Sequence, residues 1–178
     1  MNICIYGAAS DKLAHNIIEE IENMSRQLAR QGHSLIFGAG GTGAMGAAAR
    51  GFAAEGANIL GIAPGFMDDF ELLSDQCTQV ISVKTMSERK MIMETASDIF
   101  IITPGGIGTL DEFFEILTLK ELGQKDCEIL VLNIDDYYTD LENFLKKRVE
   151  AGIIQSRVTE LYRVFTTGDE IVEYIKEM

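Results

Sequence analysis

The feature that most constrains the fold is a regular alternation of short apolar runs with longer segments of helical periodicity. Several short runs are apolar throughout, which is typical of strands in a parallel sheet whose two faces are both covered. We therefore predict an α/β fold. It is one doubly wound, Rossmann-like domain over residues 1–178, with a mostly parallel sheet and helices on both faces.

Apolar runs and glycine or proline breaks define the predicted elements. The predicted strands are 2–6, 34–37, 58–63, 78–83, 98–103, 128–133 and a short edge strand at 163–166. The predicted helices are the run that ends before Gly32, an Ala-rich run to 55, 84–97, a run that ends at 122, 138–151 and a last helix from about 169. Residues 65–76 are expected to form a loop with at most one helical turn.

Composition excludes several function classes. The chain has 28 acidic and 15 basic residues and a formal net charge of −13, which disfavours nucleic acid and anionic membranes as partners. Three distant cysteines and two histidines without ligand spacing predict buried thiols, no metal site and no cofactor. With no apolar run of about 18 residues and no basic leader, we expect a soluble, cytoplasmic protein.

Ligands of such folds bind at the carboxyl ends of strands, which directs attention to the loops after Tyr6, Phe37 and Thr103. The third loop leads into a helix and holds Gly105, Gly106, Gly108 and Thr109. Glycines let the backbone approach a ligand, and free N–H groups at a helix start favour phosphate. We predict a phosphate cradle here; the alternative is a plain strand-to-helix turn.

The second loop matches G-x-G-x-x-G twice, but no acid ends the next strand to hold a ribose, which argues against NAD. Its glycines, Gly40 and Gly41 among them, either approach a mononucleotide or allow close packing of helix and sheet.

Three charged residues stand out in the middle of the chain. Arg89 shares a helical stripe with Met86 that should face the sheet, where an unpaired charge is costly, so it binds a ligand or snorkels at the helix start. Lys90 is predicted to form a surface pair with Glu94. Glu112 is either part of a capping box with Thr109 or a carboxylate beside the ribose of a nucleotide. The same T-x-x-E pattern recurs at 85–88, 139–142 and 167–170.

Two segments together carry a specific resemblance. Met86–Lys90 has the form M-x-x-R-K, and residues 104–112 have the form P-G-G-x-G-T-x-x-E. This pair resembles the signature of the LOG family, long labelled lysine decarboxylases, whose characterised members are cytokinin riboside 5′-monophosphate phosphoribohydrolases or related nucleosidases. The resemblance extends over nearly the whole chain, including the glycine-rich loop at 38–46 and residues 132–138.

The resemblance implies that Arg89 and Glu112 are the catalytic pair. It implies that Gly105, Gly106, Gly108 and Thr109 hold the 5′-phosphate and that Met86 and Lys90 line the site. It also implies a homodimer. The chain departs from the family at residues 7–10, which read Gly-Ala-Ala-Ser, at Ala39 and Ala44 of the second loop and at Ser87, and it has no Trp. These changes surround the expected base pocket, so they bear on substrate identity.

The expected reaction is hydrolysis of the N-glycosidic bond of AMP or an N6-modified AMP, giving free base and ribose 5-phosphate. A fixed carboxylate stabilises the cation that develops at the anomeric carbon, acting as nucleophile or general base. Arg89 holds Glu112 ionised or binds ribose or phosphate oxygens. The alternative is a non-catalytic carrier of a phosphorylated ligand, resembling molybdenum-cofactor carriers. Decarboxylation has little support, because pyridoxal phosphate chemistry needs a Schiff-base lysine and a partner for the ring nitrogen.

Overall fold

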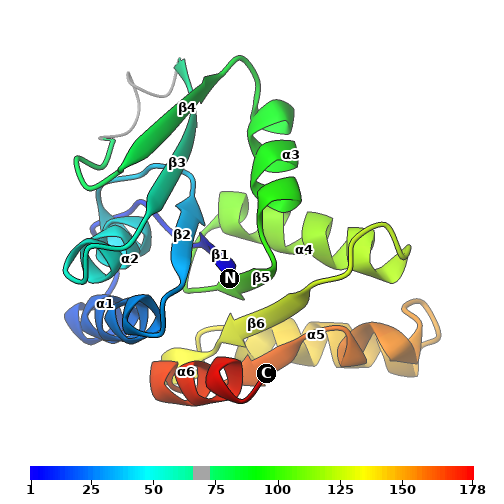
Figure 1. Ribbon diagram of the computed structural model, residues 1–178. Helices are drawn as coiled ribbons and strands as arrows, with labels where there is room; N and C mark the ends of the chain where they lie inside the picture. The colour runs from blue at the N-terminus through cyan, green and yellow to red at the C-terminus, as the bar shows by residue number, and fades with distance from the viewer. Residues whose placement is uncertain (66–72) are drawn as a thin grey trace.

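The computed structural model describes residues 1–65 and 73–178 and has a seven-stranded parallel sheet at its centre (Figure 1). The strand order is β4-β3-β2-β1-β5-β6-β7. The strands are β1 (Asn2–Tyr6), β2 (Ser34–Phe37), β3 (Ile59–Pro64), β4 (Gln79–Val83), β5 (Ile99–Ile102), β6 (Glu128–Leu132) and β7 (Arg163–Phe165). The helices are α1 (His15–Arg30), α2 (Gly43–Ala53), α3 (Met86–Ala96), α4 (Ile107–Glu121), α5 (Thr139–Glu150) and α6 (Gly168–Glu177). The predicted fold class is confirmed.

Helices cover both faces of the sheet, as the wholly apolar strands require. Side chains of α1, α2 and α6 pack with one set of alternate strand residues, such as Ile3 and Leu35. Side chains of α3, α4 and α5 pack with the other set, such as Phe100 and Ile129. Figure 1 shows α1 and α2 on one side of the strands and α3 and α4 on the other. Among the described residues no helix is long and apolar enough to cross a membrane.

The strand bounds agree with the sequence to within one residue, whereas the helix starts agree less well. At α4 the N-cap is Gly106, so Thr109 lies inside the first turn, and of the two alternatives given for Glu112 the capping box is wrong. The helix begins earlier because the glycine loop itself supplies the extended N-cap residue. The pattern at 139–142 is no capping box either: Tyr138 is the N-cap of α5, without a side-chain cap.

The other two patterns do cap their helices. The Thr85 side chain accepts from the Glu88 N–H at α3, and Thr167 with Glu170 forms a complete capping box at α6. The loop predicted at 65–76 falls partly on residues 66–72, which lie outside the described residues.

The strand order reverses direction at β1, and this reversal indicates where a ligand site should lie. The chain moves outward from β1 through β2, β3 and β4, then returns to pair β5 with the other edge of β1. The loops that follow β1 and β5 therefore diverge to opposite faces and leave a crevice at the carboxyl ends of these strands. In open α/β sheets, ligands bind at such a switch point.

Candidate active site

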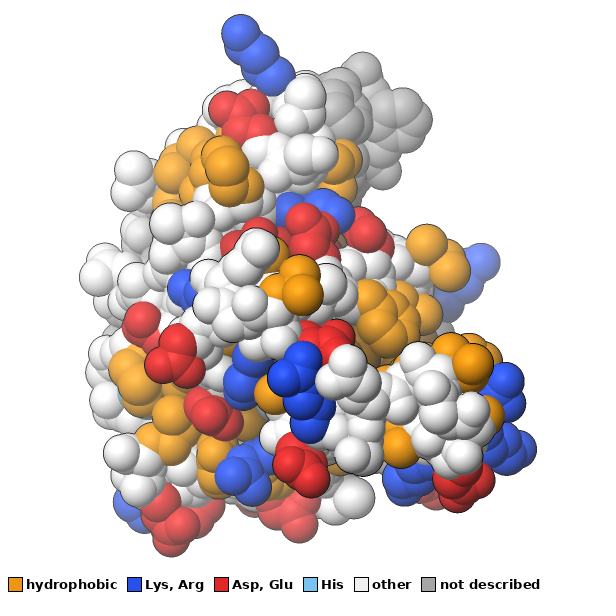
Figure 2. All heavy atoms as spheres, turned by 90° about the vertical axis from the view of Figure 1, so that its right-hand side faces the viewer, with side chains coloured by type: hydrophobic (Ala, Val, Ile, Leu, Met, Phe, Trp, Pro, Cys, Tyr) orange, Lys and Arg blue, Asp and Glu red, His pale blue; other side chains and the backbone are white. Residues whose placement is uncertain are grey.

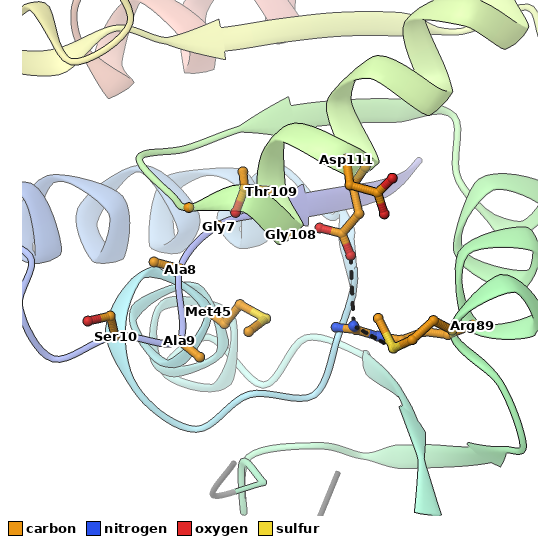
Figure 3. Close-up of a pocket in the computed structure, with 12 residues that line it drawn as sticks. Gly7, Ala8, Ala9, Ser10, Met45, Arg89, Gly108, Thr109 and Asp111 are labelled. Atoms are coloured by element: carbon orange, nitrogen blue, oxygen red, sulfur yellow. Dashed lines mark hydrogen bonds and ion pairs between the residues drawn. The ribbon is translucent and has the colours of Figure 1, made fainter. Parts of the chain in front are cut away.

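A cavity of about 380 Å³ lies at this switch point, within the usual range of about 300–1,000 Å³ for small-molecule sites. Four segments form its wall: the loop after β1, α2, α3, and the start of α4 with the loop that leads into it. Its lining residues are Gly7, Ala8, Ala9, Ser10, Met45, Met86, Arg89, Gly106, Gly108, Thr109, Asp111 and Glu112. Figure 3 shows Arg89 reaching in from α3, with the Gly7–Ser10 loop and Met45 on the other side.

Arg89 is held by backbone carbonyls as well as by a carboxylate. It is only 6% exposed. Its Nε donates to the carbonyl of Ile62, within β3, at 3.1 Å, and its Nη2 to the carbonyl of Gly38, directly after β2, at 3.3 Å. A buried guanidinium requires such partners, because an unpaired buried charge is strongly destabilising. The side chain therefore does not snorkel to solvent; its orientation is fixed inside the protein.

The remaining guanidinium nitrogen faces the predicted catalytic carboxylate. Arg89 Nη1 lies 3.9 Å from Glu112 Oε1, and both side chains are about nine-tenths buried. Glu112 stands in the second turn of α4 and is brought to Arg89 from a position 23 residues away in the chain. The structure thus brings together the two residues that the sequence paired as catalytic.

The backbone around Arg89 has space for no further atoms. A Cβ at Gly38 would lie 1.6 Å from Arg89 Nη2, so glycine at this position is required by the place of the guanidinium. Ala39, one of the departures from the resemblance noted in the sequence, adopts a φ of 66° and is fully buried. Left-handed backbone conformations are uncommon for residues with a Cβ. Ala39 therefore adopts a backbone conformation that glycine would adopt more easily.

The predicted phosphate loop forms one end of the cavity. Gly106, Gly108 and Thr109 line it, and Gly105 adjoins it. A Cβ at Gly105 would lie 2.1 Å from Thr109 Oγ1, which explains glycine there by close packing. The N–H groups of the first turn of α4 have no partner within the helix, and the helix dipole adds positive potential at that end. This arrangement favours an anionic ligand.

Lys90 lies outside the lining of the cavity. Its Nζ bonds to Asp111 Oδ2 at 2.9 Å and to the Glu115 carboxylate, so it joins α3 to α4. The predicted surface pair with Glu94 is therefore wrong. Lys90 bonds to α4 because Asp111 and Glu115 of that helix lie within its reach. The spacing of residues within one helix cannot predict a contact with another helix.

Gly40 and Gly41 also lie outside the lining. Gly40 forms an isolated bridge with Leu73, and the Gly41 carbonyl lies against Gly46, so the described contacts of these two glycines are packing contacts. The second loop contributes to the site instead through the Gly38 carbonyl and through Met45 of α2. Sequence reasoning did not name Met45 or Asp111, which line the cavity. It pointed to residues 7–10 through the rule on strand ends and through their departure from the family pattern, without assigning any of them a role.

Burial raises the pKa of three titratable groups, Cys4, Tyr6 and Glu94, which favours their neutral forms. Burial, with the Glu112 charge second, raises the pKa of the Cys4 thiol. Burial also raises the pKa of Tyr6. Burial and the nearby Glu115 raise the pKa of Glu94 to about 7. Residues 1–65 and 73–178 contain no group of three His, Cys, Asp or Glu side chains placed to hold a metal ion.

Comparison with known proteins identifies the family. A family model described as "possible lysine decarboxylase" matches residues 45–175. Cytokinin riboside 5′-monophosphate phosphoribohydrolase LOG3 of Arabidopsis thaliana is 31% identical over 98% of this chain and 81% of its own length. The chain belongs to the LOG family. LOG4 of the same plant is 30% identical over the same shares, so the family likeness spans the motifs and the fold together.

Solved structures give the fold a second set of neighbours. The molybdenum cofactor carrier protein of Chlamydomonas reinhardtii superposes with a TM-score of 0.75 at 20% identity, covering 99% of this chain and 96% of that one. The molybdenum cofactor binding protein of Rippkaea orientalis has a TM-score of 0.74 at 20% identity, covering 99% and 95%. At such identity the likeness extends to the fold alone. This chain and these molybdenum cofactor proteins thus share one architecture.

Proposed function

We propose that this LOG-family protein is a phosphoribohydrolase that cleaves the N-glycosidic bond of a nucleoside 5′-monophosphate. The substrate is AMP or an N6-modified AMP, and the products are free base and ribose 5-phosphate. The observation that carries the proposal is the buried pair of Arg89 and Glu112 beside a helix N-terminus in one cavity. Curated relatives named as phosphoribohydrolases, about 30% identical over nearly the whole chain, support the same reaction.

The proposed mechanism assigns one task to each part of the cavity. The 5′-phosphate binds at the loop of Gly105, Gly106, Gly108 and Thr109, which places the ribose over the following turn of α4. As the bond to the base breaks, positive charge develops at the anomeric carbon, and the Glu112 carboxylate stabilises it. Water adds its hydroxyl to that carbon and its second proton goes to the departing base.

Arg89 acts in this mechanism through Glu112. Two of its three nitrogens donate to the carbonyls of Ile62 and Gly38, and the third faces Glu112. A fixed guanidinium favours the charged form of the carboxylate and holds it in one place. This geometry supports a positioning role for Arg89 in preference to direct phosphate binding.

The test is base release from a panel of nucleoside 5′-monophosphates, including AMP and N6-isopentenyl-AMP, followed by chromatography. Wild type should release base, and Glu112→Gln should bind nucleotide but release none. Glu121→Gln is a matched control on the same helix, because Glu121 pairs with Arg157 far from the cavity. Turnover by Glu112→Gln near the wild-type rate would refute the assignment.

A carrier would behave differently in the same experiment. It would bind a phosphorylated ligand without releasing base from any member of the panel. Binding without release by wild type would therefore favour a carrier of the kind that shares this fold. A pterin absorbance in the purified protein would point the same way.

We also propose that the protein is a homodimer. Exposed hydrophobic side chains lie on the face of α3 and α4, where Figure 2 shows them between charged ones; Met91 is 57% and Phe114 37% exposed. Burying such side chains against a second copy would remove them from water. Light scattering after size exclusion should give twice the mass of the 19.6 kDa chain, and a monomer mass would contradict the proposal.

A further inference from the structure

Four consecutive carbonyl groups of the loop before α4 each have a donor within the protein. The Thr103 carbonyl accepts from the Tyr138 hydroxyl at 2.7 Å, and the Gly105 carbonyl from the Tyr137 hydroxyl at 3.0 Å. The Pro104 carbonyl accepts from the Ala8 N–H and the Gly106 carbonyl from the Leu110 N–H. The carbonyl groups of the loop are therefore already bonded within the protein, whereas its backbone N–H groups are the groups left to face the cavity.

We propose that Tyr137 and Tyr138 are positioning residues that fix the direction of the loop carbonyls and thereby select a phosphate over an uncharged ligand. The inference rests on the proposed function, because it concerns the same loop. Neither tyrosine lines the cavity. Both act from behind the loop, on the side opposite the ligand.

The loop needs such an external restraint because of its two adjacent glycines. A Cβ at Gly106 would meet open space, and glycine adopts positive φ at no steric cost. The peptide between Gly105 and Gly106 is therefore free to rotate as far as its own sterics are concerned. Rotation would turn the Gly105 carbonyl toward the cavity, where its negative end would repel phosphate. The bond from Tyr137 opposes this rotation.

The two tyrosines are themselves held by an unusual turn after β6. Asp135 and Asp136 have φ values of 52° and 58°, a conformation that residues other than glycine adopt rarely. Asn133 accepts from the Tyr138 N–H at 2.6 Å, and the two tyrosine rings pack edge to face with centroids 5.0 Å apart. Backbone strain of this kind persists where the surrounding structure requires it. Here it brings two adjacent hydroxyls to alternate carbonyls of one loop.

The experiment compares a ligand with a phosphate and one without. Calorimetry gives the Kd of ribose 5-phosphate, which has no base to release, and of adenosine. In Tyr137→Phe, ribose 5-phosphate should bind about two- to tenfold more weakly, as for loss of one hydrogen bond, and adenosine should bind as in wild type. Tyr162→Phe is the matched control, because its hydroxyl bonds to Glu142 away from the cavity.

Each outcome separates the two proposals. Equal weakening of both ligands in Tyr137→Phe, or no weakening of ribose 5-phosphate, would overturn the positioning role. If wild type binds adenosine but not ribose 5-phosphate, the phosphate site itself is wrong and both proposals fall. If wild type binds ribose 5-phosphate but releases no base, only the enzymatic proposal falls. Tyr138→Phe, checked first for an unchanged melting temperature, should repeat the selective loss.

Discussion

Replacing Gly38 by alanine should disable the site while leaving the fold intact. The three atoms nearest to the new Cβ all belong to the Arg89 guanidinium, the closest at 1.6 Å. Because these atoms end a side chain, the guanidinium must move and the backbone need not. Moving it breaks the bonds to Gly38 and Ile62 and removes the charge from Glu112.

The size of the effect follows from these lost contacts. A hydrogen bond from a charged group contributes about 1.5–3 kcal/mol. If the displaced guanidinium finds new partners in part, losing the bonds to Gly38 and Ile62 should lower the free energy of unfolding by about 3 kcal/mol. For a chain of this length, about 2–4 °C of melting temperature corresponds to each kcal/mol, so we expect a fall of about 6–12 °C. Loss of one preorganised electrostatic contact in an active site typically lowers kcat about 10²–10³-fold.

The assay is a double-mutant cycle on base release and on thermal unfolding. Gly38→Ala, Arg89→Met and the double variant are compared with wild type. Since the clash involves Arg89 alone, Gly38→Ala should cost almost nothing further in the Arg89→Met background. Gly65→Ala is the control, because among residues 1–65 and 73–178 its Cβ would meet only Ser82 Oγ, at 3.7 Å. Additive losses in the double variant would refute this account of Gly38.

Two further predictions concern the contact between α3 and α4. Lys90→Met should lower the free energy of unfolding by about 1 kcal/mol in urea, because it leaves Asp111 and Glu115 unpaired, and Lys90→Arg should restore most of it; unchanged stability with weaker nucleotide binding would instead make Lys90 a substrate ligand. Burial raises the pKa of Glu94 to about 7 from 4.5, so the folded protein retains a proton that the unfolded chain loses, and wild-type stability should fall as pH rises from 4.5 to 7. Glu94→Gln should match wild type near pH 4 and exceed it by about 1–3 kcal/mol at pH 8, whereas a difference independent of pH would contradict the assignment.

The sequence predicted the strands well because each is apolar throughout and ends at a glycine, proline or polar residue. It also paired Arg89 with Glu112, which lie close together in the structure, although only through two family motifs, since no spacing rule connects residues on separate helices. The wrong predictions came from short sequence patterns whose meaning depends on the surrounding three-dimensional structure. T-x-x-E at 109–112 has the letters of a capping box, but a helix start depends on backbone angles, and here Gly106 supplies them.

Other parts of the site could not have been predicted from one sequence. The requirement for Gly38 comes from a side chain 51 residues away, and the bond from Tyr137 to Gly105 spans 32 residues. Both contacts depend on where strands end relative to one another in the sheet. A glycine pattern indicates close approach, but it does not say whether a ligand, a guanidinium or another backbone approaches.

With a net charge of −13, the long-range field of the protein repels a nucleotide. A site for an anion must therefore overcome this repulsion locally. Arg89, which lines the cavity, does not offset this repulsion, because two carbonyls and Glu112 already engage its guanidinium. In the proposed site, attraction then comes from the backbone N–H groups at the start of α4, at short range. A loop can supply it only if its carbonyls are turned away together, and the two tyrosine hydroxyls are bonded to two of these carbonyls. On this argument, phosphate recognition here depends on residues that never touch the phosphate.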